Sequence, residues 1–585
     1  MNDIERLFDI PEYQLAHYPL DKCLVQKENG KWVGISTQEY INKANMMSEA
    51  LLKLGIQRGD KIGMISNNRT EWSIVDIAIL QIGAINVPIY PTISEQDYKY
   101  IFNDAGIKYC FISSEDILTK ATNIKHEVPS LIEIFTFDKI ANAKHWTELL
   151  NTANGENMDE INAIKASIKS SDLATLIYTS GTTGNPKGVM LSHENLLSNV
   201  KGSYPRLPVE PGGKSLSFLP ICHVYERMLL YLYTYTGVSI HFAESLETIG
   251  DNLKEVQPDV FTAVPRLLEK IYDKIIAKGE ALTGIKRALF FWSLSVAEDY
   301  KEKDNSAFYM IKLSIARKLI FSKWKEAVGG RIKTIASGSA SLQTRLARVF
   351  NAAEIPIMEG YGLTETSPVI SVNEIKNDGM RFGSVGKPIE FMDVRIEEDG
   401  EIVVKGPNVM IGYYNLPEKT KETFTDDGYF RTGDIGEFRN DFLYITDRKK
   451  EMFKTSGGKY IAPQVMENKY KESRFIEQIM VVGENKKLPA ALIVPSFTFL
   501  KDYCLRKGIK YNSIDDIIKN ERIINRIAKE IDLYSQKFGK WEQVKKFELL
   551  NHEWTVENGE LTPTLKLKRR IIKDKYQKEI DKIYC

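Results

Sequence analysis

The sequence predicts an α/β protein with a large N-terminal lobe and a small α+β C-terminal domain. Three observations lead to this prediction: a length of 585 residues, an alternation of short apolar runs with helical patterns, and a change of charge near residue 448. The length allows three or four folding units, because one core serves roughly 100–200 residues. A hydrophobic content of 43% and a charged content of 27% are ordinary for globular proteins and argue against a disordered chain.

Strand and helix patterns alternate in the first part of the chain. Gln38–Lys53, after Thr37, is predicted to be a helix. Lys61–Ser66 is a short apolar run, Glu71–Ile82 has apolar residues at helical spacing, and Ala84–Ile89 is a second buried strand. This alternation is typical of helices packed on mainly parallel sheets, so we expect two α/β subdomains.

Two later regions and the C-terminus depart from this pattern. Residues 267–330 have long helical periodicity with many aromatic residues and lysines, which predicts a helical insertion. Residues 383–445 contain short strands and turn sequences, which predict a β-rich subdomain. From Arg448 to the end the chain holds roughly 30 basic and 19 acidic residues, about +11 against about −10 for the remainder. We therefore predict an N-terminal lobe of residues 1–448 and a C-terminal domain of residues 449–585.

Charge and cysteine usage restrict the function and the compartment. A net charge of +1 argues against a general nucleic-acid binder, which needs a large basic excess. The five cysteines show neither metal-ligand spacing nor a disulfide framework, which suits a reducing cytosol. The first residues lack the pattern of a secretory signal, and the most apolar stretch, Ser73–Tyr90, is too short to span a bilayer. We expect a soluble, cytoplasmic protein.

The segment Tyr178–Gly188 has the composition of a phosphate-binding loop. It follows the strand pattern Leu173–Tyr178, precedes the helical pattern Ser192–Val200, and contains three glycines among several threonines. Glycines allow successive backbone N–H groups to point inward and hydroxyls add donors, which is what binding phosphate oxygens requires. It is not a P-loop of the Walker type, because Pro186 precedes Lys187 and a glycine follows it. The other interpretation is a polar surface loop.

This loop resembles the phosphate-binding motif of the adenylate-forming superfamily, which includes acyl-CoA synthetases, peptide-synthetase adenylation domains and firefly luciferase. Further segments resemble motifs of that family in the same order, and together they cover nearly the whole chain. They are Gly338–Ser341, Tyr361–Thr366, Tyr429–Asp434, Asp447–Lys450 and Leu561–Lys566. The resemblance implies binding of ATP and Mg²⁺, with coenzyme A as a second substrate, and a C-terminal domain that rotates about a hinge at Lys450.

The resemblance also implies roles for individual residues. Those implied to be catalytic are Lys566, Thr364, Glu365 and His223, and those implied to hold Mg²⁺ are Glu365 and Thr182. Those implied to bind ATP or coenzyme A are Thr179, Ser180, Gly181, Thr182, Thr183, Gly184, Lys187, Gly338, Ser339, Ala340, Tyr361, Gly362, Asp434, Arg448, Gly457 and Gly458. The last two glycines lie in a segment that would line a tunnel for the thiol.

Elementary chemistry agrees with several of these assignments. A carboxylate offers two acceptor oxygens to two ribose hydroxyls, which suits Asp434. Mg²⁺ prefers one or two protein carboxylates together with phosphates and water, so Glu365 alone suffices. Taken alone, each acid has the simpler interpretation of a turn or surface residue, and His223 that of a packed histidine. Lys566 lies in a basic run beside Lys568, and its register after a Pro/Thr turn favours it over Lys568.

Three segments bear on the acid that is activated. Phe218–Arg227, Ala263–Ile271 and the end of the insertion at 318–330 resemble long-chain acyl-CoA synthetases. The predicted function is therefore ATP-dependent ligation of a long-chain fatty acid to coenzyme A through an acyl-adenylate, with release of AMP and pyrophosphate. The alternatives are a fatty acyl-AMP ligase or acyl-carrier-protein synthetase that loads a phosphopantetheine carrier, a phosphoryl-transfer enzyme that releases ADP, and a non-catalytic binder.

The insertion mixes aromatic residues with lysines between Gly284 and Trp324. One interpretation is a face that contacts a membrane peripherally, at its inner surface, to collect fatty acids, because aromatic residues and lysines suit an interface. The other interpretation is that these side chains form ordinary core and solvent faces. The aromatic residues in question are Phe290, Phe291, Trp292, Phe308, Tyr309, Phe321 and Trp324.

Overall fold

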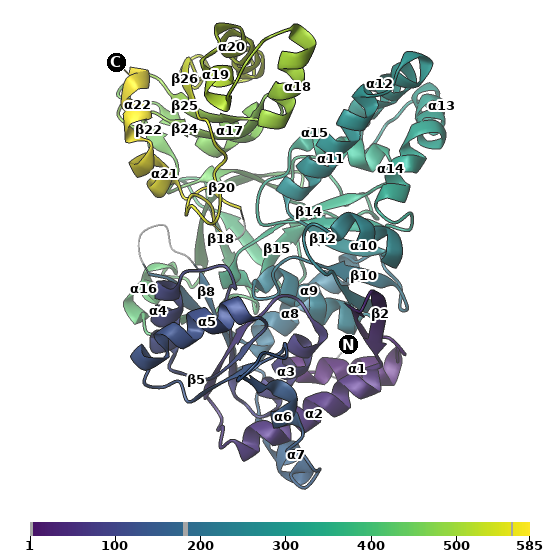
Figure 1. Cartoon of the computed structure of the whole chain (residues 1–585), viewed down its shortest axis with the longest axis vertical. Coiled ribbons are helices and arrows are strands. Elements are labelled where there is room, and N and C mark those ends of the chain that lie inside the picture. Colours follow the sequence, from purple (N-terminus) through teal and green to yellow (C-terminus); the bar gives the residue numbers. More distant parts are fainter. Residues whose placement is uncertain (1–3, 180–184, 563–564, 585) are drawn as a thin grey trace.

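The structure is a computed structural model of the chain and describes residues 4–179, 185–562 and 565–584. Over these residues the predicted α/β fold is confirmed. A large N-terminal part is built on two wide sheets, and a smaller C-terminal part lies at one end of it (Figure 1). The helical insertion projects from the same end, beside the C-terminal part (Figure 1).

The first wide sheet has eight strands in the order β19-β9-β8-β4-β3-β5-β6-β7 in the described part of the chain. The run from β8 to β7 is parallel, and β9 pairs antiparallel with β8. The strands are β3 (Lys61–Ile65), β4 (Ile85–Pro88), β5 (Ile107–Ile112), β6 (Glu133–Thr136), β7 (Lys144–His145), β8 (Leu173–Thr179), β9 (Lys187–Ser192) and β19 (Gly412–Tyr413).

The second wide sheet has nine strands over the described residues, in the order β16-β15-β14-β13-β12-β10-β11-β1-β2. The run from β14 to β1 is parallel, as predicted for helices packed on parallel sheets. The strands are β1 (Leu24–Glu28), β2 (Lys31–Ile35), β10 (Lys214–Ser217), β11 (Ser239–Phe242), β12 (Val260–Ala263), β13 (Thr334–Ser337), β14 (Ile357–Gly362), β15 (Val369–Val372) and β16 (Lys387–Pro388).

Helices fill the space between the two sheets and cover their outer faces. The central core combines side chains of both sheets with those of α1 (Ile10–His17), α2 (Thr37–Lys53), α3 (Thr70–Gln81), α8 (His193–Ser203) and α9 (Val224–Tyr235). Helices α4 (Glu95–Ala105) and α5 (Glu115–Ile124) pack on the outer face of the first sheet. Helices α10 (Ile249–Val256) and α15 (Thr344–Ala352) pack on the outer face of the second sheet. Two short helices, α6 (Trp146–Leu150) and α7 (Met158–Ser167), lie beside α2.

Local chemistry accounts for the predicted elements. Helix α2 begins with a capping box, in which the Ser36 hydroxyl accepts from the Glu39 backbone N–H while the Glu39 carboxylate accepts from the Ser36 N–H. The predicted strand–helix–strand run from residue 61 corresponds to β3, α3 and β4. The helix predicted at Ser192–Val200 corresponds to α8, whose N-cap is Ser192, and the segment before it, for which no element was predicted, forms β9. Antiparallel pairing with β8 defines this strand, with Val189 opposite Ile177 and Met190 opposite Leu176.

The region predicted to be β-rich contains a separate four-stranded antiparallel sheet in the order β17-β18-β20-β21. Its strands are β17 (Asp393–Ile396), β18 (Glu401–Lys405), β20 (Phe430–Arg439) and β21 (Phe442–Arg448), with α16 (Pro417–Glu422) before β20. Strand β21 ends at Arg448, so the last two strands of this sheet carry the chain to the predicted hinge.

The C-terminal domain has a three-stranded sheet and a short hairpin over its described residues. The sheet contains β24 (Ile476–Val482), β25 (Ala490–Pro495) and β26 (Lys546–Leu549), and the hairpin contains β22 (Phe453–Lys454) and β23 (Tyr460–Ile461). The helices are α17 (Pro463–Tyr470), α18 (Phe497–Lys507), α19 (Ile514–Lys519), α20 (Glu521–Ser535), α21 (Arg569–Lys575) and α22 (Gln577–Tyr584).

The helical insertion is present and has its own apolar core. It contains α11 (Pro265–Glu280), α12 (Gly284–Glu298), α13 (Ala307–Ala316), the π-helical segment η4 (Arg317–Phe321) and α14 (Ser322–Ala327). Phe290, Phe321 and Trp324 are buried in this core, and Phe291, Trp292 and Tyr309 are partly buried against it. Of the aromatic residues considered for a membrane face, only Phe308 is exposed.

The cysteines in the described part of the chain are free thiols inside the fold. Cys23, Cys110, Cys222 and Cys504 are free and buried, and Cys585 lies outside the described residues. No helix in the described part of the chain has the length and apolar character needed to cross a bilayer.

Candidate active site

Asp434 lies at the centre of a hydrogen-bonded group in the N-terminal lobe. It is buried on β20, directly opposite Arg448 at the end of β21. The Arg448 Nε donates to Asp434 Oδ1 at 3.1 Å, and the Tyr361 hydroxyl donates to Asp434 Oδ2 at 2.7 Å. Two strands of the β-rich sheet and one strand of the second wide sheet thus bring together three of the residues expected to bind the nucleoside.

Glu365 lies beside a second group that includes a lysine from the phosphate-loop region. The Tyr413 hydroxyl donates to Glu365 Oε1 at 2.8 Å, and the Lys187 ammonium lies 5.1 Å from the centre of the Tyr413 ring. Burial, together with the positive charges of Lys450 and Lys419, lowers the pKa of Lys187, while Glu365 acts in the opposite direction. The structure therefore brings Lys187 and Glu365 close together, as the sequence predicts for a metal–phosphate site.

The carboxylate of Glu365 suits a magnesium ion. Its Oε2 has no hydrogen-bond partner among the residues that the structure describes, so an oxygen remains for a hard cation. No group of three or more His, Cys, Asp or Glu residues in the described ranges has the geometry of a self-contained metal centre. A single protein carboxylate is what an ion shared with phosphates requires. Thr182, the other predicted ligand, lies outside the described residues.

His223 forms the N-cap of α9, and its Nδ1 accepts from the backbone N–H of Tyr225 at 3.2 Å. Burial and the nearby charge of Lys566 lower the pKa of His223 to about 4, so the imidazole is neutral at physiological pH. The effect of Lys566 also shows that this C-terminal lysine lies close to the N-terminus of α9. His223 is therefore a neutral polar group. Its ring packs edge-to-face against the ring of Tyr90.

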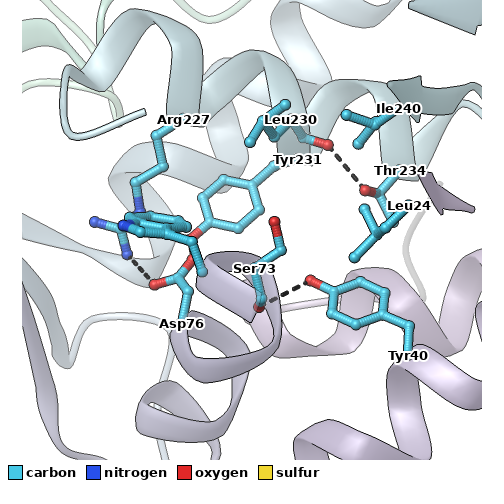
Figure 2. A pocket seen from close by; sticks show the side chains of 10 residues that line it. Leu24, Tyr40, Ser73, Asp76, Arg227, Leu230, Tyr231, Thr234 and Ile240 are labelled. Atoms are coloured by element: carbon cyan, nitrogen blue, oxygen red, sulfur yellow. Dashed lines mark hydrogen bonds and ion pairs between the residues drawn. The ribbon is translucent and has the colours of Figure 1, made fainter. Parts of the chain in front are cut away.

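A buried ion pair fixes α9 one turn beyond His223. The Arg227 guanidinium donates to Asp76 on α3 at 2.6 Å (Figure 2). It also donates to the Thr175 hydroxyl on β8 at 2.7 Å. Tyr231 also donates to Asp76 (Figure 2). The small cavity beside these residues has a volume of about 10 Å³, enough for one water molecule and far too small for a substrate. This network is structural: it ties the helix that carries His223 to the strand that leads into the phosphate loop.

Two glycines permit close approach at the expected adenine site. A Cβ atom added at Gly362 would lie 1.7 Å from the carbonyl oxygen of Pro368, so no other residue fits. One added at Gly338 would lie 3.2 Å from the Tyr225 ring. Gly338 is buried, Ser339 is half-buried with a φ of 68°, and Ala340 is exposed. The loop after β13 therefore turns directly over α9.

Lys566 enters the cleft from the C-terminal domain on a tight loop. The Thr562 N–H donates to the Lys566 carbonyl at 2.8 Å, the Lys566 N–H donates to the Thr562 hydroxyl at 3.0 Å, and Leu565 has a φ of 60°. Residues 563–564 lie outside the described part. Lys568, the alternative candidate, is instead the N-cap of α21.

The charges around Lys566 come from the N-terminal lobe. Burial and the positive charge of Arg448 lower the pKa of Lys566 to about 8, and the negative charges of Asp434 and Glu365 partly oppose this. Lys566 is half-buried, and its ammonium has no hydrogen bond or ion pair with any described residue. An unpaired lysine held beside these groups is available to an anion placed in the cleft.

The remaining predicted site residues fall into three groups: those on elements next to Glu365 and Lys187, those on the C-terminal hairpin, and those outside the described residues. Thr364 is half-buried at the start of the short turn that contains Glu365, and Thr179 ends β8 opposite Lys187. The structure does not bring Gly457 and Gly458 to this cluster: they are exposed at the tip of the β22–β23 hairpin. The loop residues Ser180, Gly181, Thr182, Thr183 and Gly184 lie outside the described residues.

The sequence did not reveal three residues that support the site. Tyr413 bonds Glu365 and lies under Lys187, Tyr225 packs beneath Gly338, and Arg569 anchors the Lys566 loop. Each contacts a partner far away in the sequence, so no local pattern identifies it. Of the three, Tyr225 is the one that lies in a segment singled out from the sequence, Phe218–Arg227, which resembles acyl-CoA synthetases.

Comparison with known sequences places this site in a family. The profile of the AMP-binding enzyme family matches residues 11–414, and that of the AMP-binding enzyme C-terminal domain matches residues 451–585. The chain is 33% identical to long-chain-fatty-acid–CoA ligase FadD15 of Mycobacterium bovis, over 98% of this chain and 95% of the relative. It is 31% identical to long-chain-fatty-acid–CoA ligase 5 of Rattus norvegicus, over 100% and 89%.

Solved structures share the fold at lower identity. The adenylation domain of a carboxylate reductase from Mycobacterium chelonae superposes with a TM-score of 0.77 at 22% identity, over 100% of this chain and 92% of that one. An anthranilate CoA ligase in complex with anthranoyl-AMP gives a TM-score of 0.75 at 18% identity, over 98% of both chains. The site geometry, both sequence profiles and the near full-length relatives lead to one conclusion: this chain belongs to the AMP-binding enzyme family.

Proposed function

We propose that the protein joins a long-chain fatty acid to coenzyme A at the expense of ATP, through an acyl-adenylate. The observation that carries the proposal is the proximity of Lys566 to Arg448, Asp434, Glu365 and His223, so that a lysine of one domain meets the nucleotide-binding groups of the other. Relatives that span nearly the whole chain are named as long-chain-fatty-acid–CoA ligases, which supports the same acid and the same acceptor.

In the first step a carboxylate oxygen of the fatty acid bonds to the α-phosphorus of ATP, and the bond from that phosphorus to pyrophosphate breaks. A carboxylic acid has a pKa near 4 and is already ionised at neutral pH, so no general base is needed. The neutral His223 therefore acts as a polar contact and takes no proton. Lys566 and Lys187 meet the charge on the phosphate oxygens. Glu365 would hold a magnesium ion, which would supply further positive charge.

In the second step the thiol of coenzyme A attacks the acyl carbon, and the bond from that carbon to the AMP oxygen breaks. The β22–β23 hairpin with Gly457 and Gly458 is the segment assigned to the thiol, and it lies away from the cluster while Lys566 occupies the cleft. A different orientation of the C-terminal domain would bring it there. Asp434 and Arg448 hold the AMP moiety in both steps, since they belong to the N-terminal lobe.

The products of ATP test this function directly. With a long-chain acid, ATP and Mg²⁺, we expect pyrophosphate and, after coenzyme A is added, AMP and acyl-CoA in equal amounts. Formation of ADP would contradict adenylation and support phosphoryl transfer. A screen of acids from acetate to C20, each assayed with coenzyme A and with a holo-carrier protein, identifies the acid and the acceptor. A clear kinetic preference for the carrier would favour the alternative enzyme, a carrier-protein acyl synthetase.

We also propose that the insertion contacts a membrane surface through one face of α13. Along this helix and η4, Phe308, Ile311, Ile315 and Leu319 follow one another at helical spacing and are 68%, 60%, 45% and 45% exposed. The opposite face is buried through Leu313, Ala316 and other core residues. A surface helix normally has a polar outer face, so an apolar outer face indicates a partner that covers it.

The charges beside this α13 face fit an anionic bilayer. Residues 307–327 contain five basic residues and one acidic residue. Lys312, Lys318 and Lys323 have no ion-pair partner among the described residues. A second copy of the chain would bring like charges together, whereas anionic headgroups would neutralise them while the apolar side chains enter the interface.

Vesicle sedimentation tests this contact. We expect the wild type to bind vesicles that contain phosphatidylglycerol, and the double variant Ile311→Gln/Ile315→Gln to bind about tenfold more weakly, because two side chains no longer enter the apolar region. The matched control is Ile132→Gln, since Ile132 is 57% exposed in the N-terminal lobe. Equal binding of all three proteins would contradict the proposal, and a wild-type dimer that the double variant abolishes would assign the face to self-association.

A further inference from the structure

Helix α11 of the insertion presents a row of charged side chains to the C-terminal domain. Arg266, Glu269 and Glu280 occur at intervals that place them on one side of the helix, and Arg266 and Glu280 are separated by about 21 Å along its axis. The other side is buried through Leu268 and Tyr272. We call Arg266, Glu269 and Glu280 the α11 dock, because each connects to the C-terminal domain.

At the C-terminal end of the α11 dock, Glu280 binds Arg474 with both carboxylate oxygens. Arg474 Nη2 lies 3.2 Å from Glu280 Oε2, and Nη1 bonds Oε1. Arg506 on α18 lies 3.9 Å from the same carboxylate, and the Arg474 guanidinium packs 4.3 Å from the centre of the Phe499 ring. Hydrogen bonding to Arg474 lowers the pKa of Glu280, so the carboxylate stays charged.

At the N-terminal end, Arg266 forms an ion pair with Glu477 at the start of β24. Between the two ends, the Gln343 side-chain amide donates to Glu269 Oε1 at 2.9 Å and to the Lys471 carbonyl of the C-terminal domain at 3.4 Å. The segment from Lys471 to Glu477 is thus bound directly to α11 at two points and, through Gln343, indirectly at a third. It is one continuous strip of the C-terminal domain, immediately after α17.

A chain of hydrogen bonds connects this strip to the Lys566 loop. Glu477 and Val481 lie on the same strand, β24, and the Val481 N–H donates to Glu467 Oε1 at 2.7 Å. The other oxygen of Glu467 binds Arg569, three residues after Lys566. Arg569 also bonds Glu451 at 2.9 Å. These contacts therefore link the position of β24 on α11 to that of the Lys566 loop.

Apolar side chains near the hinge leave a cavity at the domain boundary. A cavity of about 220 Å³ lies between the β-rich sheet and the C-terminal domain. It is lined on one side by Ile435 and Thr446 and on the other by Met452, Met466 and Phe538. Side chains on the two sides of this cavity are therefore not packed against one another. The ion pairs of the α11 dock add polar contacts between the domains at a separate place.

We propose that the α11 dock positions Lys566 for adenylation, so that Glu280, Arg474, Arg266 and Glu477 are positioning residues of the first step. This inference rests on the proposed function, because it assigns the dock to one of its two half-reactions. The dock residues touch no substrate, and they act through Arg569 on the loop that carries Lys566. Weakening the dock then slows the step that needs Lys566 in the cleft and leaves the thiol step unaffected.

Charge reversal across the Glu280–Arg474 pair tests this inference. The proteins compared are the wild type, Glu280→Arg, Arg474→Glu and the double reversal. The control is Arg395→Glu, which breaks an Arg–carboxylate pair to Asp427 of 2.8 Å inside the β-rich sheet. The first step is measured as pyrophosphate formed in a single turnover without coenzyme A. The second is measured as acyl-CoA formed from supplied acyl-AMP, and trypsin cleavage near Lys450 reports domain separation independently of activity.

We expect each single reversal to slow the first step by about tenfold, since an attractive charge-assisted contact becomes repulsive and the docked population falls. The second step should be unchanged, trypsin should cleave faster, and the double reversal should be faster in the first step than either single variant. Arg395→Glu should match the wild type. First-step rates equal to the wild type, or equal losses in both steps, would overturn the inference. A wild type that forms no pyrophosphate would instead overturn the proposed function.

Discussion

Lys566 is the residue on which the proposed chemistry depends most. Its ammonium stands beside Arg448, Asp434 and Glu365 without a partner among the described residues. We expect Lys566→Ala to reduce the rate of pyrophosphate formation by about 100- to 1,000-fold, the usual cost of losing one preorganised group that stabilises charge in a transition state. The measurement is single-turnover pyrophosphate release with a saturating fatty acid.

The control for this substitution is Lys568→Ala, which removes a neighbouring lysine that caps α21. It should leave the first step within a factor of two or three of the wild type. If Lys568→Ala caused the larger loss, the catalytic assignment would move to that residue. Acyl-CoA formation from supplied acyl-AMP should survive both substitutions, since the thiol step does not use this ammonium.

The pH dependence of the first step should report the charge of Lys566. Burial and Arg448 lower its pKa to about 8, so the ammonium is present below that pH and is lost above it. The rate should therefore fall as the pH rises through about 8. His223, with a pKa of about 4, stays neutral throughout this range and adds no second transition.

Lys566→Arg provides the comparison, because a guanidinium stays protonated at every pH in this range. This variant should be slower than the wild type, since the geometry differs, but its rate should not fall near pH 8. A wild-type profile that is flat from pH 7 to 9.5 would show that the first step does not need this charge. A profile of Lys566→Arg that falls with the wild type would assign the transition to another group.

Some of the site residues were predictable and others were not, for a physical reason. Asp434, Arg448, Glu365 and Lys566 lie in short motifs, and the structure brings these four together. Tyr413 could not be predicted, because its contact with Glu365 depends on how an edge strand meets a loop about 48 positions earlier in the sequence. Pairs that form across the fold leave no local pattern of charge or spacing.

At the scale of elements, the pair of helices α3 and α9 is held by one buried ion pair. Asp76 and Arg227 are both inaccessible to solvent, and Asp76 also accepts from Tyr231 and the Asn86 amide. Removing one partner leaves a buried charge without compensation. We expect Arg227→Met to destabilise the N-terminal lobe by about 3–5 kcal/mol, measured as a lower midpoint in thermal or urea unfolding.

Two comparisons separate this effect from simple loss of a side chain. Arg395→Met, at a surface pair with Asp427, should cost about 0–1 kcal/mol. The double variant Asp76→Asn/Arg227→Met should be less destabilised than the sum of its single substitutions, because the uncompensated charge is gone. Strict additivity would contradict the view that the two groups act as a pair.

The sequence predicted most element types, and its errors have identifiable causes. Glu71–Ile82 was predicted as a helix and α3 spans Thr70–Gln81, because apolar spacing at a buried face is a strong local signal. Strand β9 was not predicted, because only three residues separate the glycine-rich segment from the predicted helix and so short a run carries no clear period. For the aromatic residues of the insertion the sequence left two interpretations, a membrane face or ordinary packing. Only Phe308 of them is exposed, beside Ile311 and Ile315 on α13, since periodicity alone does not say which side of an apolar helix is covered.

At the scale of the whole molecule, the two parts of the chain carry net charges of opposite sign. The chain from Arg448 to the end carries about +11 and the remainder about −10, and the ion pairs of the α11 dock lie at their boundary. Raising KCl from 0.1 to 1 M shortens the screening length from about 10 to about 3 Å. We expect the radius of gyration from small-angle scattering to increase with salt as the domains separate.

The variant Arg474→Glu should already be expanded at 0.1 M KCl and should respond less to added salt. Sodium sulfate strengthens apolar burial. If apolar packing were the main restraint between the domains, adding sodium sulfate should therefore reduce the radius of gyration instead of increasing it. A scattering curve that is the same at both salt concentrations, in wild type and variant, would show that the domains stay together by contacts other than these charges.

The sulfur atoms of this chain offer a practical route to watching such rearrangements. Cys23, Cys110, Cys222 and Cys504 are all buried, and burial raises the pKa of each thiol. Maleimide reagents need an accessible thiolate, so these four side chains should stay unmodified in the native protein. With Cys585 replaced by serine, two introduced cysteines could carry a donor and an acceptor dye on opposite domains, and single-molecule fluorescence would then follow one turnover at a time.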